Sequence, residues 1–150
     1  MAARDNPNGD ELIARTERSE ANGTEVVSEA HDGAAAVVGE YTDTEFESMV
    51  TLVAVRAPSR ALMSYLFTEP EDLGLAVAME EVIDAGAVEC LVRNPPIFED
   101  QDIDTGDRVA LLCQRTDENL TVQLVPSGQS DVAAMAGIVD DAWEHIAGED

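Results

Sequence analysis

The sequence contains no lysine, and its basic side chains, histidine aside, are eight arginines. These face 32 acidic residues, so the formal net charge is −24 over 150 residues. Nucleic-acid binding depends mainly on Lys and Arg that neutralise phosphates, so the imbalance argues against direct nucleic-acid binding. It also disfavours binding to an anionic membrane surface. A GxxxxGK phosphate loop is excluded because it requires a lysine.

Long apolar runs are also missing. The longest, Met49 to Val55, is far shorter than the roughly 20 residues of a membrane-spanning helix. The first residues lack the apolar stretch of a secretory signal, so we expect a cytoplasmic protein without a membrane partner. Cys90 and Cys113 lie in apolar contexts and predict buried thiols, with a cross-strand disulfide or a redox pair as the alternatives. Neither has zinc-ligand spacing, and we expect no metal and no cofactor.

Apolar residues make up 45% of the chain, which is enough to build a hydrophobic core. A foldable chain with a carboxylate-rich surface, and with arginine in place of lysine, is typical of proteins from extreme halophiles. Molar salt shortens the Debye length to about 3 Å and screens the repulsion between these carboxylates. The composition therefore predicts an acidic, haloarchaeal type of protein.

Residues 1–33 carry little apolar periodicity, and we expect a flexible, disordered acidic tail with at most a short helix between Asp10 and Ser19. Residues 34–150 are expected to form a single α+β domain. Five strands are predicted, at 36–41, 46–56, 87–93, 108–115 and 120–125. Helices are predicted at 60–67, at 69–85, and from a cap at Ser130 to Ala147.

The predicted order after the tail is β-β-α-β-β-β-α, a mainly antiparallel sheet of about five strands with helices packed on it. Read with a short leading helix across residues 34–147, this order resembles that of roadblock and longin-type domains. The resemblance implies a five-stranded antiparallel sheet and a role as a dimerising adaptor.

Two groups of residues are candidate sites. Basic groups are scarce in this chain, and those near a predicted helix start favour the binding of an anion. The tentative ligand-binding site therefore consists of Arg56, Ser59, Arg60 and Arg93. Structural ion pairs with the many carboxylates are the alternative role for these arginines. The tentative protein interface consists of Leu75, Met79, Val82 and Trp143. Trp143 is also suited to closing the edge of the core.

The aspartates between Glu99 and Asp107 alternate as in a calcium-binding loop, but counting from Asp100 the loop lacks the required glycine and the final glutamate. We interpret it as a solvated loop. No serine–histidine or cysteine–histidine frame is recognisable, so no catalytic residues are predicted. The leading hypothesis is a non-enzymatic protein that associates with a protein partner or with itself as a homodimer. The alternative is a sensor or enzyme that binds an anionic metabolite through the arginines.

Overall fold

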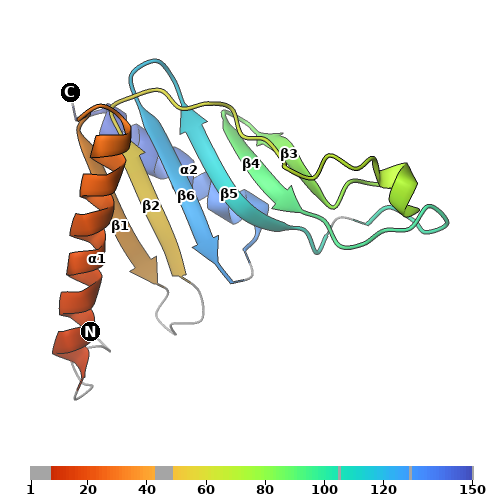
Figure 1. Ribbon diagram of the computed structural model, residues 1–150, viewed down its shortest axis with the longest axis horizontal. Helices are drawn as coiled ribbons and strands as arrows, with labels where there is room; N and C mark the ends of the chain where they lie inside the picture. Colours follow the sequence, from red (N-terminus) through yellow and green to blue (C-terminus); the bar gives the residue numbers. More distant parts are fainter. Residues whose placement is uncertain (1–7, 43–48, 105, 129, 150) are drawn as a thin grey trace.

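The computed structural model describes residues 8–42, 49–104, 106–128 and 130–149. These residues form two α-helices, a short 3-10 helix and one antiparallel sheet of six strands (Figure 1). In chain order the elements are α1 (Gly9–Ala30), β1 (Ala36–Thr42), β2 (Met49–Val55), η2 (Pro70–Leu73), β3 (Glu80–Ala85), β4 (Val88–Arg93), β5 (Val109–Thr116), β6 (Thr121–Ser127) and α2 (Val132–Ala147).

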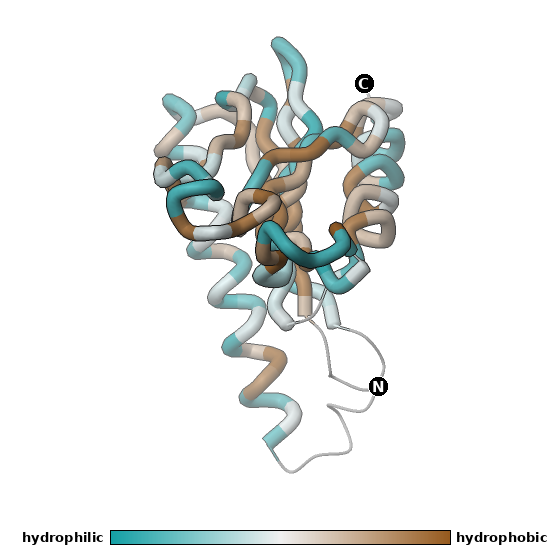
Figure 2. Tube along the Cα trace, turned by 90° about the vertical axis from the view of Figure 1, so that its right-hand side faces the viewer, coloured by the Kyte–Doolittle hydropathy of each residue, from teal (hydrophilic) through white to brown (hydrophobic). Residues whose placement is uncertain are grey.

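The sheet has the strand order β1-β2-β6-β5-β4-β3, and every neighbouring pair is antiparallel. Helix α2 packs on β4, β5 and β6 from one face of the sheet, whereas α1 lies beside β1 at one end (Figure 1). Viewed from the β3 end, the two helices lie on opposite sides of the sheet (Figure 2). The α+β class and the antiparallel sheet are therefore confirmed, with six strands instead of about five.

The core lies between α2 and the sheet, where alternate residues of each strand point toward the helix. The helix predicted up to Ala147 is present as α2, and its apolar residues Val132, Met135, Val139 and Ile146 pack on this core. Trp143 is 7% exposed and lies under the guanidinium of Arg115, which is 4.6 Å from the ring centroid. The fully buried strand residues of the core are Val88, Cys90, Val92, Cys113, Val122 and Leu124.

The expectation of free thiols is wrong, because Cys90 and Cys113 form a disulfide inside this core. They are directly paired residues of β4 and β5, and their Cα atoms are 4.1 Å apart. Adjacent antiparallel strands bring such pairs close enough for a bond. The sequence pattern left this alternative open, and the register decides it.

Residues 9–30, expected to be mostly irregular, instead form the 22-residue helix α1. Its surface is mainly polar (Figure 2), so apolar periodicity gave no strong signal. Polar contacts help to hold it: Thr24 Oγ1 accepts a 3.0 Å hydrogen bond from the Val38 amide, and Glu20 Oε1 accepts one of 2.7 Å from the Glu40 amide. Gly23 also lets the helix pack closely on the Val38 side chain. Helix α1 thereby covers the open edge of the sheet. The domain boundary at residue 34 stays a prediction, and residues 1–7 lie outside the described residues.

The two helices predicted between residues 60 and 85 are wrong. Residues 60–67 are extended, and the segment 69–85 forms η2 and then β3. Gly74 ends η2 in the left-handed conformation at φ 70°. Gly86, expected to end a helix, is instead the first residue of a two-residue hairpin turn, with φ 66°. The element order that resembled roadblock and longin-type domains required a helix here, so that order is not present.

The remaining predictions differ from the structure in smaller ways. The strand predicted at 46–56 is β2, of which residues 46–48 lie outside the described residues. The strands at 87–93, 108–115 and 120–125 correspond to β4, β5 and β6. The cap of α2 is Asp131 rather than Ser130, since the Asp131 side chain accepts a hydrogen bond from the Ala134 amide. Neither helix in the described ranges has the length and apolar character needed to cross a membrane.

Candidate interaction surfaces

Residues 57–67, which we call the strap, run in extended form across the sheet face opposite α2. Four side chains of the sheet hold its backbone, and the first is Thr121, whose Oγ1 donates to the Ala57 carbonyl at 2.7 Å. Thr116 Oγ1 accepts from the Ser59 amide at 3.0 Å, and Gln114 Nε2 donates to the Arg60 carbonyl at 2.7 Å. Glu89 Oε1 accepts from the Leu62 amide at 2.9 Å. The strap is therefore fixed although it has no regular secondary structure.

Gln114 is the centre of this attachment and is completely buried. Its amide nitrogen also donates to Glu89 at 2.5 Å, and its oxygen accepts from Gln123 Nε2 at 2.8 Å. A buried amide is tolerated only when its polar atoms have partners, and here both ends are satisfied. The cluster thus links β4, β5 and β6 to the strap.

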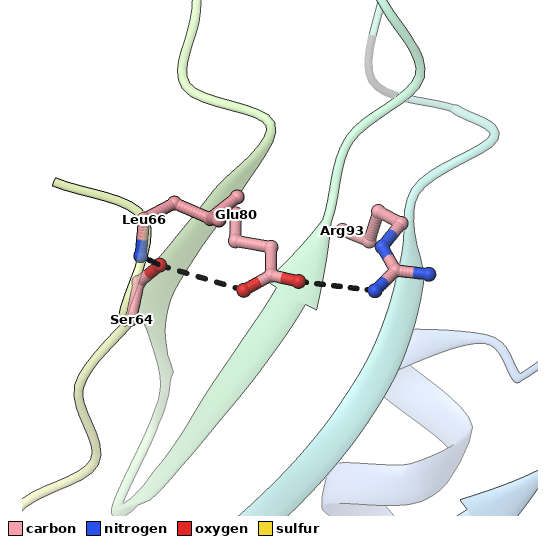
Figure 3. A network of polar contacts seen from close by, with 4 residues as sticks. All are labelled: Ser64, Leu66, Glu80 and Arg93. Atoms are coloured by element: carbon pink, nitrogen blue, oxygen red, sulfur yellow. Dashed lines mark hydrogen bonds and ion pairs between the residues drawn. The ribbon is translucent and has the colours of Figure 1, made fainter. Parts of the chain in front are cut away.

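The far end of the strap is held by a chain of polar contacts (Figure 3). Arg93 donates to Glu80 Oε1 at 3.0 Å, and the Ser64 hydroxyl lies 3.5 Å from Glu80 Oε2. The same hydroxyl accepts a 3.1 Å hydrogen bond from the Leu66 amide. Arg93 therefore orients a carboxylate that contacts the strap.

The outward side of the strap is apolar. Leu62 and Ser64 are partly buried, whereas Met63, Leu66 and their neighbours face solvent. Tyr65 and Phe67 are 76% and 73% exposed, and their rings meet edge to face with centroids 6.3 Å apart. Because Leu62 and Ser64 face the sheet, the rings of Tyr65 and Phe67 lie in solvent.

This exposure is unusual because the protein has few aromatic residues. The described part of the chain contains five, and Trp143 is the one among them that is buried. The other four are exposed: Tyr41, Tyr65, Phe67 and Phe98. Aromatic side chains are enriched in the centres of protein interfaces. Their exposure in a protein with so few therefore makes these surfaces candidates for protein contacts.

A second apolar surface lies on the opposite face, between α2 and strands β1 and β2. It is a groove of about 610 Å³. Its floor consists of three cross-strand pairs, Val37 with Ala54, Gly39 with Leu52, and Tyr41 with Val50. One flank of α2 forms its wall through Ile138, Asp141, Ala142, His145 and Ile146, and Glu149, just after the helix, continues the wall. The i, i+3, i+4 spacing of these residues places them on one side of the helix.

The four residues of the expected anion site are not brought together. Arg56 follows β2 and donates to the Ile146 carbonyl at 3.1 Å, near the end of α2. Arg93 pairs with Val109 at the start of β5. Thr116, which holds Ser59, is at the other end of β5, about 20 Å from Val109 along the strand. Ser59 and Arg60 belong to the strap through their backbone contacts. Arg93 has the ion-pair role that was the alternative.

The residues of the expected interface also lie apart from one another. Leu75 and Trp143 are 5% and 7% exposed, so neither offers a surface to a partner. Val82 is partly buried in β3, and Met79 precedes that strand with moderate exposure. Leu75, Met79 and Val82 had been placed on a helix that does not form, whereas Trp143 lies on α2 as expected. The strap was missed because its ordering depends on buried Gln114 and Glu89, which are distant in sequence.

Within the described ranges, no group of three or more histidine, cysteine or acidic side chains is placed to hold a metal ion. Comparisons with known protein families, with curated proteins and with solved structures find no match for this chain.

Proposed function

We propose that this protein is a non-enzymatic association domain of an extreme halophile, and that the strap is its protein-binding surface. A second copy of the chain or another protein would cover the side chains of Tyr65 and Phe67. The observation that carries the proposal is the combination of fixed backbone and exposed aromatic rings on the strap. Because the strap is already ordered, a partner would lose little entropy in docking on it.

The charge of the surface agrees with association in concentrated salt. A net charge of −24 on each molecule opposes contact between acidic proteins in dilute buffer. At molar ionic strength the Debye length is about 3 Å, and an apolar contact is then not opposed by distant charges. A location in the cytoplasm, where some halophiles keep molar KCl, is part of the proposal.

Photo-crosslinking tests the proposal directly. A photoreactive amino acid at position 66 lies on the strap, and the same group at exposed position 118, in the β5–β6 turn, is the matched control. In cells or extracts kept at molar KCl, we expect position 66 to form a specific product, either a dimer of this chain or one defined heterocomplex. Equal, diffuse labelling from both positions would contradict the proposal.

A further inference from the structure

Helix α2 covers only part of the sheet face on which it packs. It packs on β4, β5 and β6, and the groove lies over β1 and β2. A helix about 10 Å across covers roughly two strands spaced about 4.8 Å apart. The uncovered part of the sheet therefore has the width of one further helix beside α2. Apolar faces of this kind are normally covered by a second layer.

The floor of the groove also has a length that suits a helix. Val37 and Tyr41 are four residues apart on β1, about 13 Å, which corresponds to about nine residues of a helix. Such a helix would place about three apolar side chains over the floor. A Cβ atom on Gly39 would lie 2.8 Å from the Tyr41 ring, so the glycine lets this ring lie against the strand.

An added β-strand is a poorer occupant of this region. A strand would have to pair with the open edge of β1. The Val38 and Glu40 amides on that edge already donate to Thr24 and Glu20 of α1. Recognition through side chains that enter the groove is therefore favoured over backbone pairing.

Charge indicates what kind of helix fits. Asp141 on α2 and Glu149 just after the helix border the groove, and His145 Nε2 lies 3.3 Å from Glu149 Oε1. The groove extends to the C-terminal end of α2, where backbone carbonyls favour a cation. The chain's own Arg56 already donates to the Ile146 carbonyl there. A second copy of this chain would bring 32 more acidic residues and no lysine.

We propose that the groove between α2 and the β1–β2 ladder binds an amphipathic helix of another protein, with an apolar stripe flanked by Lys and Arg. This inference goes beyond the strap and does not depend on it. The strap and the groove are on opposite faces of the sheet, so each can be occupied while the other is bound. The protein would then connect two partners.

Selection from a library of random peptides of about 14 residues, displayed in molar KCl, tests this inference. The wild-type protein is the target, and Ala142→Phe, which fills the groove, is used for counter-selection. A second groove variant is Val37→Arg, at an exposed position of the floor that tolerates a larger side chain. We expect enriched peptides with apolar residues at i, i+3, i+4 and i+7 and with flanking Lys or Arg, and at least tenfold weaker binding to both variants.

Charge reversal at the rim provides the specific control. Asp141→Arg/Glu149→Arg is expected to weaken the binding of the basic peptides at least tenfold. Glu25→Arg/Glu118→Arg changes the net charge by the same amount away from the groove and is expected to leave the affinity for these peptides unchanged. Enrichment of acidic or aperiodic peptides, or no enrichment over the filled variant, would overturn the inference. So would a wild-type dimer that Val37→Arg converts to a monomer, since a second copy would then occupy the groove.

Discussion

The buried amide of Gln114 donates a 2.7 Å hydrogen bond to the backbone carbonyl of Arg60, 54 residues earlier in the chain. This bond joins the centre of the sheet to a segment without secondary structure. It explains how the strap keeps one conformation while its apolar side chains remain in solvent. Removing the amide should therefore release the strap without dismantling the core on the other face.

Gln114→Met is the corresponding test. The change removes the donor to the Arg60 carbonyl and leaves the partly buried Glu89 carboxylate without the Gln114 contact, so the free energy of unfolding should fall by about 1–3 kcal/mol. Limited chymotrypsin digestion in molar KCl should cleave faster after Tyr65, Leu66 and Phe67. Glu118→Gln, in an exposed turn, should cleave at the wild-type rate. Unchanged cleavage of the Gln114 variant would show that the strap is held by other contacts.

The disulfide should stabilise the fold. The two cysteines are separated by 23 positions, and closing a loop of that length lowers the entropy of the unfolded chain by an amount worth about 3 kcal/mol. Cys90→Ala/Cys113→Ala should lower the free energy of unfolding by roughly this amount in chemical denaturation.

Thiol counting on protein taken directly from cells is the companion measurement. Disulfides are rare in reducing cytosol, so the oxidation state of these cysteines in cells also tests the proposed cytoplasmic location. We expect no free thiol after denaturation without reductant. Two reactive thiols would show that the cysteines remain reduced in the cell.

The polar cover over β1 should prevent edge-to-edge association. Glu20→Ala/Thr24→Val removes both acceptors and exposes the Val38 and Glu40 amides, so sedimentation should show new oligomers. Glu20→Gln/Thr24→Ser keeps an acceptor at each position and should behave as the wild type. If the two double variants sediment alike, α1 does not protect this edge.

How far the sequence predicted this structure depends on where the ordering contacts lie. Strands β4, β5 and β6 and helix α2 follow from local apolar patterns and turns, and they were predicted. Residues 69–85 carry a good helix start at Thr68–Glu71, but pairing with β4 selects a strand for Glu80–Ala85. Contacts between distant residues overrode local preference at this position.

The surfaces were harder to predict than the fold. Sequence spacing grouped Arg56 with Arg93, although the antiparallel order puts the ends of β2 and β4 at opposite ends of the sheet. The strap requires Gln114 to be buried, which only the register of β5 reveals. A polar residue within an otherwise apolar strand, in LLCQR, was the one local sign of such an attachment.

Salt dependence tests the interpretation of the composition. With a net charge of −24, lowering KCl to tens of millimolar extends the repulsion over tens of Å and should unfold the protein. Circular dichroism across a salt titration should show a loss of structure that is reversed by returning the salt. A spectrum unchanged down to low salt would contradict the assignment to a halophile.

The most direct measurement of the role of the strap is the size of the native complex in extracts at molar KCl. The wild-type chain should elute well above the 16.0 kDa of a monomer, whereas Tyr65→Ser/Phe67→Ser should lose the partner bound at the strap and elute at a smaller size than the wild type, with an unchanged circular dichroism spectrum. Loss of interface aromatics at about 2 kcal/mol each weakens binding about 30-fold per residue. Leu12→Ser/Val26→Ser, at exposed apolar positions of α1, should elute with the wild type. A strap variant that keeps the wild-type elution, or a wild-type chain that is itself monomeric in these extracts, would contradict the account.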